Sequence, residues 1–323
     1  MRSASLAAAL KQYQVPVVNV SGSTVPGADF PRVSSDAAAV RRMAVDHLYD
    51  CGLRTIAFCG ERGRRFVEYW TVAYQQVIKQ RRLRAHIYTH APGITQRSGY
   101  ATIQHDRERW LEELLKPAGV IGWDTKICRE LAGACEWTGL AVPDEVALIS
   151  LSTEDLIGRA AHPPLSGVDI ALQRIGYEAA QILDGLMEGA RPPAEPFRIP
   201  PLGVTTRQST DVLAVDDDRV RQALRFIREH ESESIDVRDV LHVVLMARRV
   251  LERRFQQLLG RTPAEEIRRV HLEKVKRLLI ESDLPIPEVD EASGFQYVEH
   301  MIPVFKKHFG MTPLAFRKQA RPR

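Results

Sequence analysis

Up to about Pro201, short apolar runs rich in β-branched residues alternate with segments whose apolar residues recur at helical spacing. The runs are 15–20, 55–59, 86–89, 119–123 and 146–151, and the amphipathic segments are 36–51, 68–81, 107–115, 125–138 and 172–188. Strands that alternate with helices predict a parallel α/β sheet. Because ligands of such sheets bind beyond the carboxyl ends of the strands, we expect the binding region in the loops after Cys59, Trp123 and Leu151.

One amphipathic pattern occurs twice in the last third of the chain. In 247–263 the apolar residues recur at helical spacing, and Gly260 is expected to end the helix. About fifty residues later, 299–317 repeats this pattern with Met301, Phe305 and Phe309 and a second Gly-x-Thr-Pro ending. Short helical segments, 235–244 and 286–295, precede the two copies. The sequence therefore predicts two helix-turn-helix units in tandem.

In the first copy of the pattern, 247–263, the helix face opposite the apolar residues is cationic. Planar guanidinium donors can reach guanine edges and phosphates in a major groove. An Arg-rich amphipathic helix can also be a solvated surface helix, but the repeat favours DNA recognition. For Arg254, an ion pair with an acidic neighbour remains an open alternative. We expect base contacts from Arg249, Glu252, Arg253, Glu299 and His300, and phosphate contacts from Arg248, Arg254, Lys306 and Lys307.

Charge separates the two parts of the chain. From Arg219 onward there are 21 Lys and Arg against 15 Asp and Glu, so this part is near +6 and the rest near −2. A basic module joined to a mildly acidic one is expected of a DNA-binding domain on a sensor. We therefore assign 1–209 to a sensor, 210–218 to a linker and 219–323 to the DNA-binding domain. Within the linker, Asp216 to Asp218 predict a helix N-terminus rather than a metal site.

Composition narrows the class of protein. A chain with 44% hydrophobic and 27% charged residues is typical of soluble globular proteins. The four cysteines have no paired spacing, which indicates buried thiols. We expect a cytoplasmic protein without membrane association, since neither a signal peptide nor an apolar run of ~18 residues is present. Phosphate-binding, metalloprotease and hydrolase motifs are lacking, so an α/β metabolic enzyme is disfavoured and no cofactor is expected.

Both parts of the chain resemble known families. The last third resembles the AraC-family DNA-binding domain in Leu251, Arg254, Phe255, Gly260 and Pro263, then in Gly294, Phe295, Phe305, Gly310, Pro313 and Arg317. The first part resembles the LacI-type effector domain in VSSDAAAVRRMAVDHLYDCGLRTIAFCG, GLAVPDEVALISL, PPLSGVDIALQRIGYEAAQILDGLMEG and IPPLGVTTRQST. The fusion of these two kinds of domain in one chain is similar to that in the xylose-operon regulators. The resemblance implies an α/β periplasmic-binding-like sensor followed by an all-α double helix-turn-helix domain, and a sugar sensor that controls a transcriptional switch.

The resemblance also implies where a ligand would bind. The pocket would involve Asp36, Trp70, Trp123, Asp124, Ser152 and Glu154. Trp70 replaces a sugar-clamping arginine, and Ser152, Thr153 and Glu154 replace an Asp-Asn-Asp run. Because these changes remove paired hydrogen bonds that orient sugars, we expect no xylose binding.

In the second helix-turn-helix unit, two residues depart from the family pattern. Asp290 replaces a small alanine between the helices, where a carboxylate must be buried or force the helices apart. Pro303 lies inside the recognition helix, where we expect its penalty to be relieved partly by the nearby helix start. We therefore expect the second helix-turn-helix unit to contribute less to DNA binding than the first.

The start of the sensor departs from the family as well. The chain begins near the last strand of the first lobe, 15–20, so we expect this lobe to be truncated. The second lobe, 35–164, would be complete, whereas 2–34 and 167–210 would form a partial sheet with an uncovered edge. Two hypotheses follow: a ligand-responsive DNA-binding regulator, which is favoured, and a degenerate fragment that no longer senses ligand. Expected partners are double-stranded DNA, a small sugar, RNA polymerase if the protein activates, and a second copy in a homodimer.

Overall fold

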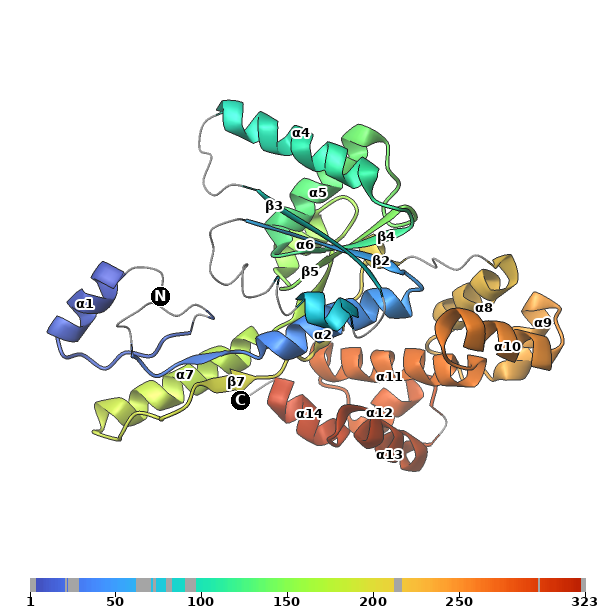
Figure 1. The fold of residues 1–323 in the computed structure, drawn as a ribbon. Helices are drawn as coiled ribbons and strands as arrows, with labels where there is room; N and C mark the ends of the chain where they lie inside the picture. Colours follow the sequence, from blue (N-terminus) through green and yellow to red (C-terminus); the bar gives the residue numbers. More distant parts are fainter. Residues whose placement is uncertain are drawn as a thin grey trace. The chain divides into compact units, whose positions relative to one another are not determined.

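The computed structural model describes residues 4–20, 22, 29–61, 71, 74–79, 83–90, 97–211, 217–295 and 297–320. The chain divides into two compact units, Met1–Val212 and Leu213–Arg323 (Figure 1). Each unit has a hydrophobic core of its own. The two units are therefore described separately.

A six-stranded sheet forms the centre of the first unit. Its order is β3-β2-β4-β5-β6-β8, and all neighbours are parallel except β6 and β8. Every residue of β4 and β5 is buried, which explains why β4 and the first four residues of β5 are apolar. The prediction of an α/β fold with strands in 55–59, 86–89, 119–123 and 146–151 is confirmed. The strands are β2 (Thr55–Glu61), β3 (Arg84–His90), β4 (Ala118–Gly122), β5 (Val146–Ser150), β6 (Ser166–Asp169) and β8 (Gly203–Thr205).

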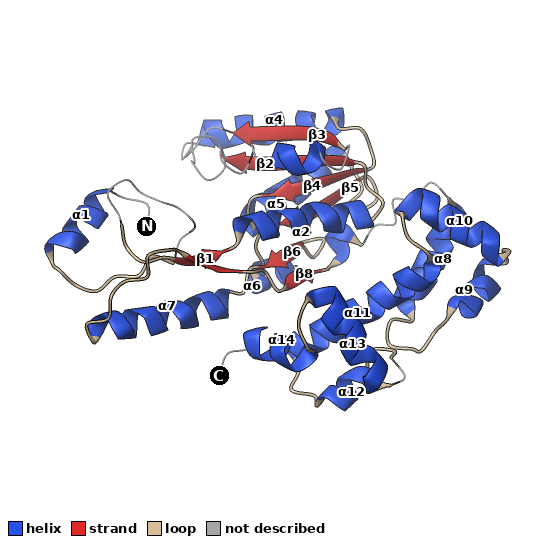
Figure 2. Ribbon diagram, turned by 60° about the horizontal axis from the view of Figure 1, so that its bottom comes forward, coloured by secondary structure: helices blue, strands red, loops and turns tan. Residues whose placement is uncertain are grey.

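Helices cover both faces of this sheet (Figure 2). Val120 of β4 belongs to the core cluster formed with α4 (Arg97–Glu113) and α5 (Thr125–Thr138). A Cβ atom added to the preceding Gly119 would lie 2.8 Å from Leu48 of α2 (Ala37–Asp50). Successive residues of a strand point to opposite faces, so α2 and α5 lie on opposite sides of β4.

The predicted helices of the first unit agree with the structure to different degrees. α2, α5 and α7 (Leu172–Met187) confirm the predictions for 36–51, 125–138 and 172–188. α4 begins ten residues before the expected start at Arg107, because its first turns carry few apolar residues from which a stripe could be detected. Half of the expected helix in 68–81 lies outside the described residues, and the described half, 71 and 74–79, is helical. The remaining helices are α1 (Ala4–Gln12), α6 (Asp155–Ala160) and the short 3-10 helix η1 (Gln208–Thr210).

One strand prediction is wrong, and another holds only in part. The run 15–20 forms no strand, and Asn19 makes an isolated bridge to Arg32. The predicted partial sheet between 2–34 and 167–210 is present as the separate parallel pair of β1 (Val33–Ser35) and β7 (Phe197–Ile199). The rest of 167–210 differs from the prediction, since β6 and β8 extend the main sheet beyond β5. The reason is packing: Ser166 and Val168 of β6 are completely buried, and an exposed partial sheet would not bury them.

The second unit consists of helices α8 to α14. The predictions of an opening helix and of two helix-turn-helix units are confirmed, the units being α9 with α10 and α12 with α13. Gly260 and Gly310 end α10 and α13 in the left-handed region, with φ of 72° and 77°. The helices are α8 (Asp218–Glu229), α9 (Val237–Val244), α10 (Arg248–Leu259), α11 (Pro263–Glu281), α12 (Ile286–Glu291), α13 (Val298–Phe309) and α14 (Pro313–Ala320).

The predicted capping role of the aspartates before α8 is confirmed for Asp217. Its carboxylate accepts hydrogen bonds from the backbone N–H groups of Arg219 and Val220. Asp218 lies in the first turn of the helix, and Asp216 lies outside the described residues. In the described part of the chain, no helix has the length and apolarity needed to cross a membrane.

Candidate nucleic-acid interface and sensor site

The first recognition helix, α10, has a buried and an exposed side. Leu251, Phe255 and Leu259 pack into the core of the second unit. Arg249 and Arg253, one turn apart, lie on the exposed side. Among the residues that the structure describes, neither has a hydrogen-bond or ion-pair partner. Their guanidinium groups are therefore available to an external acceptor.

The other two arginines of α10 have acidic partners. Arg248 donates from Nε to Glu252 Oε1 over 2.8 Å, one turn along the helix. Arg254 donates from Nη1 to Asp217 Oδ2 over 2.6 Å, so Asp217 both caps α8 and holds α10 against it. For Arg254 the structure thus has the ion pair that the sequence left open. The predicted phosphate contact of Arg254 would require this pair to be shared or broken.

The second recognition helix, α13, repeats the buried side of α10 but not its exposed side. Met301 and Phe305 stand fifty positions after Leu251 and Phe255, and all four are fully buried. At the same offset, Glu299 and Pro303 replace Arg249 and Arg253. The exposed cations of α13, Lys306 and Lys307, lie in its last turn. His300 is exposed beside the ring of Tyr297. The two helices thus share a packing pattern and differ in their reading faces.

Pro303 is the sixth residue of α13, and it lies inside the helix. An α-helix leaves only its first few N–H groups unpaired, so the N–H missing at this position would have bonded to the carbonyl of Glu299. The expected relief from a nearby helix start is therefore wrong.

Asp290 is buried in α12 and only 5% exposed, which is one of the two outcomes that the sequence allowed. Its Oδ1 atom has no hydrogen-bond partner among the described residues. Burial raises the pKa of this carboxyl, and the charge of Glu299 raises it further. In the first helix-turn-helix unit the corresponding residue is Leu241, four positions before the left-handed residue of the turn, and it packs against the core. The left-handed residues are Leu245 (φ 49°) and Gly294 (φ 79°).

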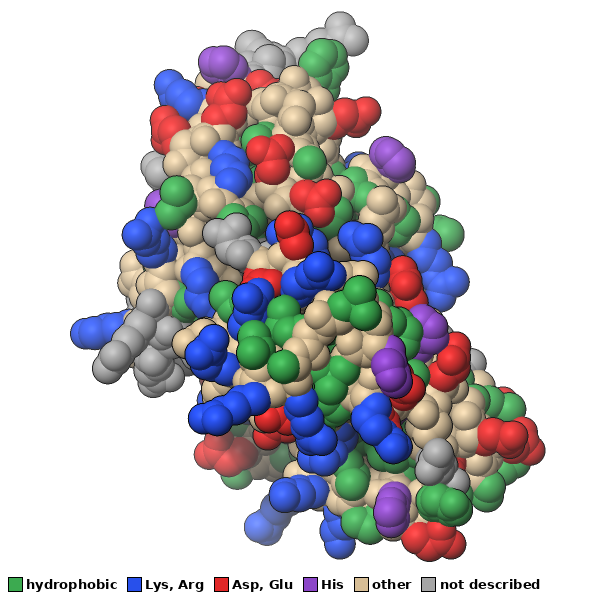
Figure 3. All heavy atoms as spheres, turned by 90° about the vertical axis from the view of Figure 1, so that its right-hand side faces the viewer, with side chains coloured by type: hydrophobic (Ala, Val, Ile, Leu, Met, Phe, Trp, Pro, Cys, Tyr) green, Lys and Arg blue, Asp and Glu red, His purple; other side chains and the backbone are tan. Residues whose placement is uncertain are grey.

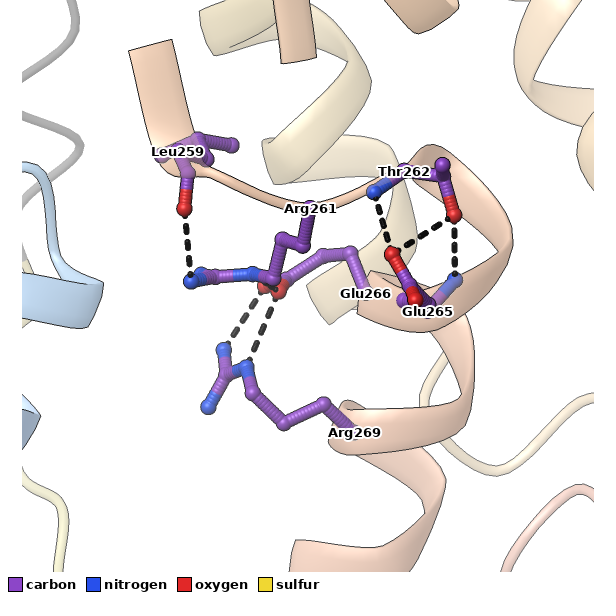
Figure 4. Close-up of polar contacts among 6 residues, drawn as sticks. All are labelled: Leu259, Arg261, Thr262, Glu265, Glu266 and Arg269. Atoms are coloured by element: carbon purple, nitrogen blue, oxygen red, sulfur yellow. Dashed lines mark hydrogen bonds and ion pairs between the residues drawn. The ribbon is translucent and has the colours of Figure 1, made fainter. Parts of the chain in front are cut away.

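Helix α11 connects the two helix-turn-helix units. A buried ion-pair cluster stabilises the start of this helix (Figure 4). Glu266 is 1% exposed and accepts from Arg261 Nε over 2.5 Å and from Arg269 Nη2 over 2.7 Å. Burial alone would raise the pKa of Glu266, but Arg269 and Arg261 outweigh it and lower the value to about 2. Thr262 and Glu265 form a reciprocal capping box at the same helix end.

Lys and Arg side chains gather in several places on the surface (Figure 3). In the second unit, the exposed cations include the described pairs Arg249 with Arg253 and Lys306 with Lys307. These pairs belong to the two recognition helices. Their positive charge matches the phosphate backbone of DNA.

Three of the expected ligand residues gather where β4 and β5 end. Asp124 caps α5 by accepting from Ile127 N over 2.8 Å. Thr125 donates from Oγ1 to the carbonyl of Ser152 and accepts from Glu154 N, which brings both residues beside it. Thr125 is buried and was not predicted, because a hydroxyl next to a capping aspartate gives no distinctive sequence signal.

The other expected ligand residues lie in different surroundings. Trp123 follows β4, and its N–H bonds to the carbonyl of Cys59 in β2. Asp36 caps α2, and its N–H bonds to the carbonyl of Ile199 in β7. Trp70 lies outside the described residues. The structure therefore groups Asp124, Ser152 and Glu154 around Thr125 and ties Asp36 to the separate two-stranded sheet.

Comparison with known proteins supports both units. A periplasmic binding protein-like domain matches residues 45–210, and a helix-turn-helix domain matches residues 242–319. The xylose operon regulatory protein of Haemophilus influenzae is 31% identical over 95% of this chain and 81% of its own length. That of Escherichia coli K12 is 30% identical over 96% of this chain and 80% of its own length. The chain belongs to the xylose operon regulator family. A solved xylose-binding transcription activator, 28% identical, covers 98% of this chain and 84% of its own, with a TM-score of 0.59.

Membership of the xylose operon regulator family establishes the general activity. The chain is a DNA-binding transcription regulator with a sugar-sensing domain. Its relatives are regulators of transcription, in agreement with the expectation that it is not an enzyme. The predicted fold, a periplasmic-binding-like α/β domain followed by a helical DNA-binding domain, is confirmed.

Proposed function

We propose that this regulator reads its operator mainly with Arg249 and Arg253 of α10. The observation that carries the proposal is that both guanidinium groups are exposed and have no partner among the described residues. A bidentate contact from Arg to guanine is the commonest specific contact in a major groove. Glu252 already accepts from Arg248 through Oε1, so a cytosine amine would have to share the carboxylate with that pair.

The second recognition helix would mainly contact the backbone. Lys306 and Lys307 supply phosphate contacts, whereas Glu299 repels phosphates unless it meets a cytosine amine. His300 remains available for a base edge. Since the two helices are units of one repeat, we propose that they enter successive major grooves about 34 Å apart.

The proposed effector is a small polar molecule related to sugars, bound beyond the ends of β4 and β5. Asp124, Ser152 and Glu154 gather there around Thr125. Polar groups that converge beyond the carboxyl ends of parallel strands are typical of ligand sites in this type of fold. Xylose, for which the relatives are named, is not the expected effector, because Trp70 and Ser152 replace groups that the family resemblance assigns to sugar binding.

We further propose a cytoplasmic homodimer that contacts RNA polymerase when it activates. A cytoplasmic location follows from action on DNA, and LacI-type sensors pair through their lobes. Sedimentation of the full chain should give twice the monomer mass of 36.4 kDa. A monomer at micromolar concentration would contradict the dimer.

The main proposal can be tested without knowing the operator. Duplexes that bind the full chain are selected from a random pool, and their affinities are compared with that of unselected DNA. We expect selected duplexes to bind at least ~10³-fold more tightly, as specific regulators do. Failure to enrich any sequence would refute sequence-specific reading by this chain.

A further inference from the structure

The first unit ends in a buried chain of hydroxyl groups. In η1, the side chains of Ser209 and Thr210 are completely buried. Thr210 Oγ1 lies 2.7 Å from Ser166 Oγ of β6 and 2.8 Å from His47 Nε2 of α2. Ser209 Oγ donates to the carbonyl of Leu148 in β5 over 2.6 Å. The end of the first unit is therefore fastened to two strands and one helix.

This degree of burial is unusual for the end of a domain. Connecting segments normally run over the surface, where water satisfies their polar groups. A buried hydroxyl costs free energy unless it is hydrogen-bonded, and here each hydroxyl has a partner. The N–H of Ser166 bonds to Ser209 Oγ, and the Ser166 hydroxyl bonds to the carbonyl of Arg207. Such a satisfied network fixes one position for the main chain at Thr210.

The helix that holds Thr210 begins at the separate two-stranded sheet. β1 leads into α2 through Asp36 alone, and the Asp36 N–H bonds to Ile199 O of β7 over 2.7 Å (Figure 2). Between its ends, α2 packs on the main sheet with a buried stripe that includes Val40, Ala44 and Leu48. A packed helix moves as one body. A displacement of the two-stranded sheet would therefore reach Thr210 through α2.

We propose that Thr210 is a positioning residue that couples the sensor to the DNA-binding unit through its hydrogen bond to His47. The inference rests on the proposed effector response. Because the first unit ends at Val212, Thr210 lies two residues before the point where the main chain leaves it. Free-energy coupling between two sites is reciprocal. DNA binding by the second unit must then alter the stability of α2, so the coupling through Thr210 can be tested with DNA and without an identified effector.

The test is hydrogen exchange of the full chain with and without a duplex selected from a random pool. In the wild type, DNA should change the exchange rates of amides in the last two turns of α2 by about fivefold or more, the lower end of typical coupling. Thr210→Val keeps the shape of the side chain and removes the hydroxyl. We expect it to bind the duplex within about twofold of the wild type and to lose the response in α2.

Thr138→Val is the matched control. Among the described residues, the hydroxyl of Thr138 bonds only within α5, to the carbonyls of Ala134 and Cys135, so this variant should keep the full response. His47→Phe removes the partner of Thr210 on α2 and should behave like Thr210→Val, and it is used instead if circular dichroism shows Thr210→Val to be unfolded. Two results would contradict the proposed coupling through Thr210 and leave the proposed function intact. One is a wild type that binds the duplex with no change in the exchange of α2, and the other is a response in α2 that survives in both variants of the Thr210–His47 pair. If the wild type binds no selected duplex, the proposed function is contradicted, and so is the coupling through Thr210 that rests on it.

Discussion

At the residue scale, the arginines of α10 differ in their partners. Arg248 and Arg254 are paired with Glu252 and Asp217, whereas Arg249 and Arg253 have no partner among the described residues. A paired arginine that binds DNA must share or lose its internal ion pair. An unpaired exposed arginine avoids that cost, so it gains more from a guanine or phosphate acceptor.

Replacing Arg253 with alanine should weaken binding to the selected duplex by about 1–3 kcal/mol, because a bidentate base contact is lost. Binding to unselected DNA should fall much less. Fluorescence anisotropy with both duplexes measures the difference. Arg129→Ala, an exposed arginine on α5 of the first unit, is the control and should change neither affinity. Equal losses on both duplexes would mean that Arg253 contacts only phosphate.

In the sensor, the residues that stand at the expected ligand positions predict that xylose does not bind. With Trp70, Ser152 and Thr153 in place of the family's polar groups, we expect no xylose binding tighter than a Kd of ~1 mM, or about −4 kcal/mol. Isothermal calorimetry on the full chain measures this. The solved xylose-binding relative, titrated in parallel, provides the positive control. A tighter Kd for this chain would show that the altered pocket still holds the sugar.

At the element scale, α13 combines the packing of α10 with a reading face of different chemistry. Its Pro303 removes one internal hydrogen bond, and Asp290 of the preceding helix lies buried with no partner for Oδ1 in the described part of the chain. Both features lower the stability of the second helix-turn-helix unit. Because its two exposed lysines lie in the last turn, its contacts should depend more on phosphate charge than on base sequence.

Footprinting of the selected duplex should therefore show strong protection over one half of the site and weak protection over the other. The double variant Asp290→Ala, Pro303→Arg should extend the protection. It should also steepen the salt dependence, since each added phosphate contact releases about one more counterion. Asp290→Ala alone removes the buried carboxylate without adding the cation of Pro303→Arg. It should therefore extend the protection without changing the salt slope. Equal protection of both halves by the wild type would contradict the ranking.

The Glu266 cluster makes the second unit sensitive to acid. Its pKa is lowered in the folded state from 4.5 to about 2, so its contribution is complete above pH 4.5 and is lost as the pH falls toward 2. Glu266→Gln should destabilise the second unit at pH 7 by about 3 kcal/mol, because Arg261 and Arg269 lose a buried counter-charge. Thermal unfolding at several pH values should show this difference shrinking below pH 4.5. Glu288→Gln, on an exposed side chain, is the control; a difference independent of pH would exclude the ion pair as its source.

At the scale of the whole molecule, the chain is two folding units with separate cores. Leu131 lies in the core of the first unit, and Phe255 lies in that of the second. Separate cores predict two transitions in calorimetry of the full chain. Leu131→Ala should lower one transition and Phe255→Ala the other, each by the equivalent of about 2–5 kcal/mol. A single transition lowered by both variants would show that the units unfold together.

Much of this architecture follows from local sequence. Buried parallel strands are apolar along most of their length, so β2, β4 and β5 are visible as runs, and the fifty-residue repeat of Leu251 and Phe255 reveals both recognition helices. Capping is equally local, as Asp217 shows. The cationic face of α10 is a property of helical spacing, and it could be predicted before any contact was known.

Other features depend on contacts between distant parts of the chain. The sequence could not show that β6 and β8 join the main sheet, because the pairing of short strands is decided by the partners that bury them. Asp217 and Arg254 stand 37 positions apart, and Thr210 and His47 stand 163 apart, so only the tertiary fold shows which charges are paired and which hydroxyls hold the end of the sensor. Local patterns determine which faces are apolar or cationic, whereas long-range packing determines which polar groups remain available to DNA.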